Sequence, residues 1–348
     1  MRVCCVLFLC AAFATAEITE QKSNTQENLR GVSAVSSSVV WASGTHGTFL
    51  RTTDGGTTWE VGHVPGAESF DFRDVEAFSA DLAYLLAAGP GEQSRIYKTT
   101  NGGKNWALQF TNKDPKGFFD CVAFWDRDHG IAVGDPVDGK FQLIKTVNGG
   151  KEWKPIPPEK LPPAMEGEGA FAASGTCIAV QGKKNVWFVT GGSAARVFRS
   201  SDAGETWSVI ETPIVHGSAS AGIFSVAFSD AKHGVIAGGD YKQPNKDVAS
   251  VATTSDAGKS WKLSTIKPQR YFSAVALRPN GGKGIVAVGT TQYAVAKTPA
   301  AQEWTEFDQL SSEPNAVAVS PGHWLIWLVG MKGAIFGAGA QDSGIQKK

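Results

Sequence analysis

The chain has 348 residues, of which 42% are hydrophobic, and its 33 basic side chains balance its 33 acidic ones. A chain without net charge has no broad electrostatic attraction for nucleic acid or for an anionic membrane surface, so we expect neither as a partner. No apolar run reaches the roughly 18 residues that a membrane-spanning helix requires, and the 40 glycines indicate many tight turns.

Residues 1–16 have the pattern of a secretory signal peptide. Arg2 provides a positive charge, an apolar stretch runs from Val3 to Phe13, and Ala14-Thr15-Ala16 is a small-residue cleavage site. A lipid anchor on Cys10 is the weaker alternative, because bulky Leu9 precedes it. The segment therefore predicts a secreted or periplasmic protein whose mature chain has no transmembrane helix.

One short phrase that ends in tryptophan recurs along the rest of the chain. It reads Thr-Thr-Asp-Gly-Gly-Thr-Thr-Trp in its first copy, and its tryptophans follow one another at intervals of 43 to 54 residues. The copies are Thr52–Trp59, Thr99–Trp106, Thr146–Trp153, Ser200–Trp207, Thr254–Trp261 and a degenerate one at Thr298–Trp304. A repeat of this length indicates one supersecondary unit used many times.

Each copy is preceded by three short apolar runs and followed by a fourth, as in consecutive antiparallel strands. The pattern predicts an all-β fold, a seven-bladed β-propeller with four-stranded antiparallel blades. We expect the blades at Val32–Val61, Arg73–Phe110, Asp120–Ile156, Thr176–Ile210, Phe224–Ile266, Phe272–Phe307 and Asn315–Gly339. A single propeller domain would span 17–340, followed by a tail at 341–348.

The seventh blade lacks a fourth strand in this pattern. The polar segment Glu17–Leu29 is expected to supply that strand and close the ring, which would remove two exposed sheet edges. A six-bladed ring with a loose tail is the alternative.

The repeated phrase has a mechanical explanation as a turn. Its Asp or Asn can accept hydrogen bonds from nearby turn amides, and its second glycine position permits a positive φ angle. Its tryptophan can fill the space between neighbouring blades. We therefore assign structural roles, in preference to calcium binding or catalysis, to Asp54, Trp59, Asn101, Trp106, Asn148, Trp153, Asp202, Trp207, Asp256 and Trp261.

These phrases resemble the Ser/Thr-x-Asp-x-Gly-x-Thr-Trp box of the BNR or Asp-box repeat, found in sialidases and other glycosidase propellers. The wider pattern, in which a Val-x-Phe run and a glycine-bounded strand precede each box, looks most like the photosystem II stability/assembly factor family. The resemblance covers about Leu29 to Gly339. It implies a propeller, and a role in the assembly or stability of a membrane-protein complex, but the scaffold also carries unrelated activities.

Candidate binding residues lie just before the innermost strands, where a propeller has its central funnel. Arginine occurs there in three blades, and three guanidinium groups on one rim would suit a carboxylate. The alternative is that each arginine pairs with a nearby acid such as Asp74 or Asp120. The funnel candidates are Arg30, Arg73, Asp120, Glu168, Arg196, Arg270 and Tyr271.

The longest loop, Lys154–Ser174, is rich in proline and is a candidate for partner contact. Cys121 and Cys177 occupy matching places in adjacent repeats. They are compatible with a disulfide in an exported protein and equally with two buried free thiols.

The sequence favours a non-catalytic scaffold. The Phe/Tyr-Arg-Ile-Pro marker of sialidases is absent, since Asn28-Leu29-Arg30-Gly31 lacks the Ile-Pro, and no dinucleotide, metalloprotease or hydrolase-elbow motif occurs. We expect no catalytic residue, no cofactor and no metal, in a monomer that binds a protein partner. The alternatives are an extracellular glycoside hydrolase of the sialidase-like superfamily and a glycan-binding propeller, because several carboxyl groups are available.

Overall fold

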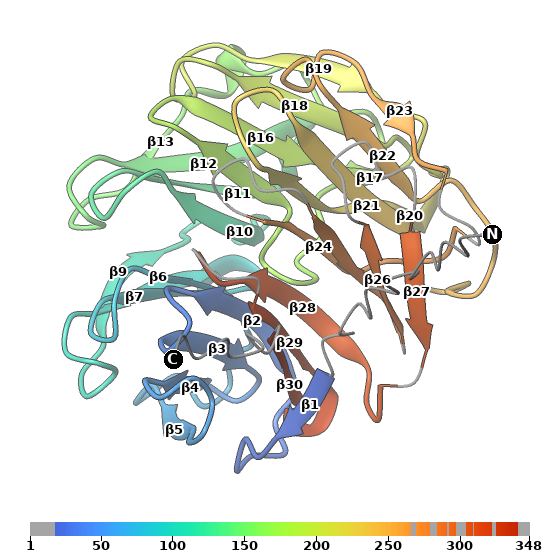
Figure 1. Cartoon of the computed structure of the whole chain (residues 1–348). Helices are drawn as coiled ribbons and strands as arrows, with labels where there is room; N and C mark the ends of the chain where they lie inside the picture. Colours follow the sequence, from blue (N-terminus) through green and yellow to red (C-terminus); the bar gives the residue numbers. More distant parts are fainter. Residues whose placement is uncertain are drawn as a thin grey trace, which may run out of the picture.

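The computed structural model describes residues 18–265, 269–278, 284–290, 292–296, 304–308, 310–321 and 325–339. The signal-peptide segment, the tail and most of the degenerate sixth copy of the turn lie outside these residues. The fold is a seven-bladed β-propeller with antiparallel blades arranged in a ring, as predicted (Figure 1). Within the described residues, no helix is both long and apolar enough to cross a membrane.

The strands of each blade follow one another from the centre of the ring outward. The first three blades are β2 (Leu29–Ala34), β3 (Val40–Gly44), β4 (Thr48–Thr52), β5 (Glu60–His63); β6 (Phe72–Ala77), β7 (Ala83–Ala87), β8 (Arg95–Thr99), β9 (Ala107–Thr111); and β10 (Phe119–Phe124), β11 (Gly130–Val137), β12 (Lys140–Thr146), β13 (Lys154–Pro155). Short runs with buried β-branched and aromatic residues, bounded by turn residues, form these strands because both faces of a blade pack on its neighbours.

The remaining blades follow the same order. Blades four to six are β15 (Ile178–Gln181), β16 (Asn185–Val189), β18 (Arg196–Ser200), β19 (Ser208–Glu211); β20 (Ser218–Phe228), β21 (Gly234–Asp240), β22 (Val251–Thr254), β23 (Lys262–Leu263); and β24 (Ala274–Leu277), β25 (Ile285–Val288), β26 (Gln292–Ala296), β27 (Trp304–Asp308). Within the described residues, three single-turn 3-10 helices lie in the connections, at Gly91–Gln93, Pro158–Lys160 and Met331–Gly333.

The seventh blade joins the two ends of the described chain. It consists of β28 (Pro314–Val319), β29 (Leu325–Gly330), β30 (Ile335–Gly339) and, as its outermost strand, β1 (Ile18–Gln21). β1 pairs with β30 in antiparallel register, and the two lie side by side in Figure 1. This confirms the prediction that the N-terminal segment closes the ring, and the six-bladed alternative is wrong.

The fifth blade departs from the four-strand pattern. Its innermost strand β20 has an N-terminal extension that pairs with β17 (Gly191–Gly192), and β17 pairs in turn with β14 (Glu168–Gly169). β14 lies in the long connection between the third and fourth blades and β17 in the short connection between β16 and β18, so this sheet has six strands. The long loop that the sequence singled out is thereby attached to the centre of the ring.

The core consists of apolar layers between adjacent blades. The indole of Trp187 in the fourth blade stacks on Phe228 in the fifth, with ring centroids 3.6 Å apart. Trp59 contacts Trp327 of the seventh blade edge-on at 6.0 Å, across the seam of the ring. Aromatic pairs of this kind add stabilisation beyond the area that they bury, and they give the innermost strands a rigid support.

Candidate functional site

Within the described residues, a β-bulge recurs in the innermost strand of five blades, at the second residue of the strand in four of them and in the middle of the longer β20 in the fifth. One residue is left out of the pairing with the second strand each time, and the bulge residues are Arg30, Arg73, Asp120, Phe224 and Asn315. A bulge re-aims the side chain of its unpaired residue. All five side chains line one of two adjoining pockets at the centre of the ring. The backbone therefore directs different side chains to the same place.

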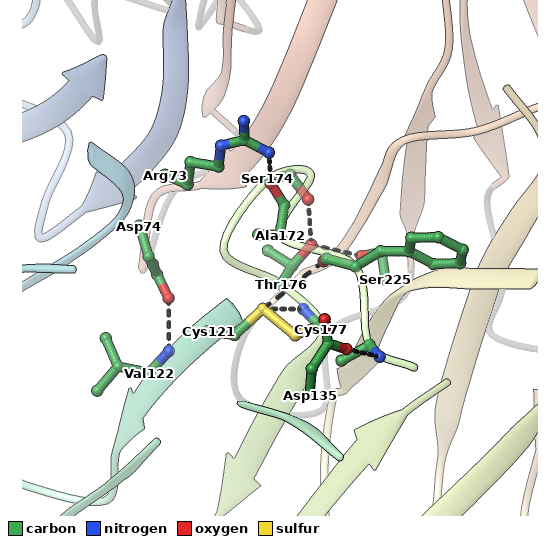
Figure 2. The surroundings of a disulfide bond; sticks show 12 residues. Arg73, Asp74, Cys121, Val122, Asp135, Ala172, Ser174, Thr176, Cys177 and Ser225 are labelled. Atoms are coloured by element: carbon green, nitrogen blue, oxygen red, sulfur yellow. Dashed lines mark hydrogen bonds between the residues drawn. A yellow bond between two sulfur atoms is a disulfide. The ribbon is translucent and has the colours of Figure 1, made fainter. Parts of the chain in front are cut away.

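The connection between the third and fourth blades also reaches the centre. Residues 170–176, which we call the plug, run from β14 to β15 and bond to four other blades. The Ala172 carbonyl accepts a hydrogen bond from Arg73 Nη1 at 3.1 Å, and Ser174 Oγ donates to the Ser273 carbonyl at 3.1 Å. Figure 2 shows the plug crossing toward the hydroxyl of Ser225, which lies 2.7 Å from Thr176 Oγ1.

A disulfide fastens the plug at its C-terminal side. Cys121 of β10 and Cys177, the residue before β15, are both fully buried and are joined through their sulfur atoms, with their Cα atoms 5.9 Å apart (Figure 2). The sequence alone could not separate this arrangement from two free thiols. At the other side, the Phe171 ring stacks on Phe224 with centroids 4.0 Å apart. The plug is thus held both covalently and by packing.

The first pocket, the arginine pocket, has a volume of about 380 Å³. Its polar and aromatic walls are Arg30, Arg73, Phe171, Phe224, Tyr241, Tyr271, Ser273 and Asn315, with Ala172 and Ala173 of the plug. The Nε atom of Arg30 is buried without a hydrogen-bond partner among the described residues. Burial, followed by the nearby Arg73, lowers the pKa of the Arg30 guanidinium. The pocket therefore holds a buried cation with unused donors.

The three arginines that the sequence predicted on one rim have different surroundings. Arg73 Nε donates to Asp71 Oδ2 at 2.7 Å, so this arginine has an acidic partner, although not Asp74 or Asp120. Arg270 donates from Nη1 to Gln292 Oε1 at 2.9 Å and does not line the arginine pocket. Within the described residues, the pocket thus brings together Arg30, Arg73 and Tyr271, but not Arg270.

The second pocket, the carboxylate pocket, has a volume of about 570 Å³ and shares Arg73, Phe171 and Ala172 with the first. Asp120, Asp135 and Glu168 line it. Among the described residues, no group of three or more His, Cys, Asp or Glu side chains is arranged to hold a metal ion.

Glu168 and Arg196, both predicted at the funnel, are engaged with each other in a buried ion pair. Arg196 Nε donates to Glu168 Oε1 at 2.8 Å, and Thr190 Oγ1 donates to the same oxygen at 2.6 Å. Arg196 Nη2 also donates to the Pro163 carbonyl at 2.9 Å. These contacts fix the long loop against the fourth blade, so we regard the two side chains as anchors of the loop.

An acidic pair in β6, the buried Asp74 and the half-buried Glu76, was not among the sequence candidates. Burial raises the pKa of Glu76 to about 8. Burial, and then Glu76, also raise the pKa of Asp74, whose Oδ2 accepts a hydrogen bond from the Val122 amide at 2.7 Å (Figure 2). Two acids at alternate positions of an innermost strand were the signal that could have identified the pair, because alternate side chains share one face of a strand.

The five described copies of the repeated turn have one geometry. The leading Thr or Ser hydroxyl lies 2.7–3.1 Å from the Asx carbonyl or carboxylate oxygen, which accepts a backbone amide at 2.9–3.0 Å. The same hydroxyl accepts the amide of the second glycine at 2.9–3.0 Å. The acidic or amide side chain is thus occupied within its own turn.

No family model and no curated protein matches the sequence of this chain. Its fold, however, is similar to that of solved propellers. A structure of YCF48 bound to D1 peptide matches with a TM-score of 0.66 and 14% identity, over 95% of this chain and 98% of that one. YCF48 from Cyanidioschyzon merolae matches with a TM-score of 0.65 and 16% identity, over 94% and 100%.

The same architecture also occurs with a different activity. A virginiamycin B lyase from Staphylococcus aureus matches with a TM-score of 0.67 and 12% identity, over 94% of this chain and 100% of the lyase. At these identities the similarity establishes the propeller fold, and function has to be argued from the residues at the centre of the ring.

Proposed function

We propose that this protein is an exported, non-catalytic propeller that binds a segment of a protein partner at the centre of its ring, with an acidic group of the partner beside Arg30. One observation carries the proposal. The Arg30 guanidinium is largely buried, and its Nε has no hydrogen-bond partner within the described chain. The acid whose charge acts on it, Asp71, forms its ion pair with Arg73 instead. A buried charge without a partner is costly to folding, typically by several kcal/mol.

A carboxylate is the ligand group that fits this pocket. The planar guanidinium presents two parallel donors to two carboxylate oxygens, and such bonds are among the strongest that proteins form. Tyr241 and Tyr271 contribute aromatic walls to the same pocket, so an apolar part of the ligand can pack beside its acidic group. A C-terminal carboxylate or an acidic side chain on an extended segment meets both requirements.

Two considerations support a protein as the partner. One solved propeller of similar fold is bound to a peptide, and the sequence resembles a family of photosystem assembly factors. We therefore propose a role in the assembly or stability of a membrane-protein complex, in a protein that acts as a monomeric scaffold.

The sialidase-like alternative requires a tyrosine nucleophile beside a glutamate. Tyr271 lines the arginine pocket, whereas Glu168 lines the carboxylate pocket and is bonded to Arg196. Burial raises the pKa of Tyr271, which makes its phenolate harder to form. A binding role for this centre is the simpler account.

The proposal is tested with an array of peptides that each end either in a free carboxylate or in an amide. We expect the carboxylate forms to bind preferentially, and Arg30→Met to weaken the best of them roughly tenfold or more, as measured by fluorescence anisotropy. The same substitution should raise the melting temperature, because it removes a buried charge without a partner.

Arg270→Met is the matched control, since Arg270 has the same chemistry but does not line the pocket. Equal binding of the amide and carboxylate forms, or unchanged binding by Arg30→Met, would contradict the proposal. Hydrolysis of aryl glycosides by the wild type would favour the enzyme instead.

A further inference from the structure

The two pockets differ in which charged groups on their walls have no ion-pair partner within the described chain: a guanidinium group in the arginine pocket and carboxyl groups in the carboxylate pocket. Most charged groups on its walls already have a partner. Glu168 pairs with Arg196, Arg73 pairs with Asp71, and Lys116 donates from Nζ to Asp138 Oδ1 at 3.1 Å. Of the charged residues that line it, Asp120 and Asp135 form no ion pair with any described residue.

Asp120 is the more deeply placed of the two. It is a bulge residue of β10, is 1% exposed, and lines the pocket. Its Oδ2 is buried and accepts no hydrogen bond from the described residues. Burial first, and then the neighbouring Asp135, raise its pKa well above the usual value, against smaller opposing effects of Arg73 and of the Asp135 and Ala172 amides. A buried carboxyl oxygen without a donor is an unsatisfied acceptor, and such atoms are rare in native structures.

Asp135 is a bulge residue as well, in the pairing of β11 with β12. Its Oδ1 accepts the amide of Ala170, at the start of the plug, at 2.9 Å (Figure 2). Burial raises its pKa. Two successive bulges thus direct two carboxyl groups into one pocket, and the hydrogen bond to the plug engages Asp135 through one oxygen.

We propose that the carboxylate pocket binds an organic cation, an ammonium or guanidinium group carried on a flexible chain such as a lysine or arginine side chain. The cation would donate to Asp120 Oδ2 and neutralise the two carboxyl groups together. The volume of about 570 Å³ accommodates a side chain. A metal ion is the poorer fit, because the described residues offer no three-ligand group here.

The two pockets adjoin, since Arg73, Phe171 and Ala172 line both. A partner segment with an acidic and a basic group would therefore lie across the plug, one group in each pocket. This extension to a partner segment rests on the proposed function, whereas cation binding in the carboxylate pocket stands independently of it.

The test uses the full chain and two simple probes, n-butylammonium chloride and n-butylguanidinium chloride, each compared with sodium chloride at the same ionic strength. Binding is measured by saturation-transfer NMR and by the rise in melting temperature that a ligand specific for the folded state produces. We expect at least one probe to bind the wild type, and the stronger probe identifies the preferred side chain.

The variants Asp120→Asn and Asp135→Asn keep the size of the side chain and remove its charge, so each should weaken binding roughly tenfold or more. Asp128→Asn, an exposed acid in the turn between β10 and β11, is the matched control and should bind as the wild type does. Two variants are used so that a folding defect in one leaves the other informative.

Absence of binding to the wild type, or unchanged binding by both pocket variants, would overturn the proposal. Arg30→Met separates the two pockets, because it should retain the cation probes while losing the carboxylate peptides. If the wild type binds the cation probes but not the carboxylate peptides, the proposed function fails. If it binds the peptides but not the probes, the inference of a cation site fails.

Discussion

The repeated turns and the repeated bulges both repeat one backbone geometry, but they differ in whether the side chain placed there is hydrogen-bonded locally. Both occur in five blades of the described chain, and both place a polar or bulky side chain at a fixed point of the backbone. At the turns that residue is always Asp or Asn, and it is bonded within its own turn. At the bulges it is arginine, aspartate, phenylalanine or asparagine, and two of the charged groups contain a buried atom without a partner.

The difference separates structural residues from binding residues without reference to any relative. Where a repeated backbone carries the same residue each time and satisfies it locally, the residue serves the fold. Where the same backbone carries a different residue each time and leaves its donors or acceptors unused, the fold supports a ligand. Unsatisfied buried groups reduce stability, so their presence at the centre favours a ligand whose polar groups compensate that cost.

Removal of the disulfide should produce the largest effect. In the chain-entropy model, a cross-link between residues 56 positions apart contributes about 4 kcal/mol to the free energy of unfolding. We expect Cys121→Ala/Cys177→Ala to lose an amount of that order in urea unfolding.

Hydrogen exchange on the same variant would sharpen the comparison. The amides of the plug should lose protection, while the glycine amides of the turns, which are bonded to Thr52 and Thr146, should keep it. Equal loss at both places would show that the centre and the turns unfold as one unit.

The free energy of unfolding should depend on pH with opposite signs in the turns and at the centre of the ring. The Ser260 hydroxyl, against a smaller opposing effect of burial, lowers the pKa of Asp256 to about 2. This turn therefore adds stability above about pH 4, which is lost as the pH falls toward 2. Burial raises the pKa of Glu76 to about 8. Its contribution is therefore complete below about pH 4.5 and is lost as the pH rises through 8.

Urea unfolding at several pH values measures both limbs. Glu76→Gln should make the decline between pH 5 and about 8.5 shallower, with the rest due to the other buried carboxyl groups of the centre. Asp256→Asn should make only the acid limb shallower, with the rest due to the aspartates of the other turns. Asparagine is a suitable replacement because two other copies carry it, as Asn101 and Asn148. A decline at high pH that is as steep in Glu76→Gln as in the wild type would contradict the assignment of part of it to Glu76.

The smallest effect concerns backbone strain within the turns. Ala203 and Ala257 adopt φ angles of +61° and +66°, where the other three copies have glycine. A left-handed conformation costs an L-residue roughly 1–2 kcal/mol, and glycine recovers part of it. We expect Ala203→Gly to raise the free energy of unfolding by about 0.5–1 kcal/mol.

Gly55→Ala is the reverse control for that change, because Gly55 has a φ of +70° and an added Cβ atom would meet a single atom within 4 Å, Ser37 O, in a tight contact of 3.3 Å. It should lower the free energy of unfolding by a similar amount. A gain for Gly55→Ala would show that the turns do not share one conformation in solution.

The fold could be predicted from sequence because the same local pattern recurs in successive blades. Turn residues at fixed spacing and short apolar runs specify the strands, and the lack of a fourth strand in the seventh blade identified the closing segment. The repeated turn also predicted the positive φ of its second glycine position, although the preceding position is left-handed too and accepts alanine.

The site could be predicted only in part, because its contacts are not local. The sequence placed Arg30 and Arg73 near the centre, but the hydrogen bond from Arg270 to Gln292 joins the segment before β24 to β26, two residues 22 positions apart. The plug depends on contacts across the ring, such as the bond from Ser174 to Ser273 over 99 positions. No periodicity encodes such contacts, so the division of the centre into two pockets required the structure.

The closing strand has a consequence for how the molecule folds. Thr19 Oγ1 donates to the Gly337 carbonyl across 318 positions, so the first strand of the described chain finds its neighbour only after the last has formed. The entropy of such a closure grows slowly, by roughly 0.6 kcal/mol for each doubling of length, but contacts this distant in sequence make folding slow. Until then two sheet edges remain open to other chains, and this interval is when the protein is most exposed to aggregation.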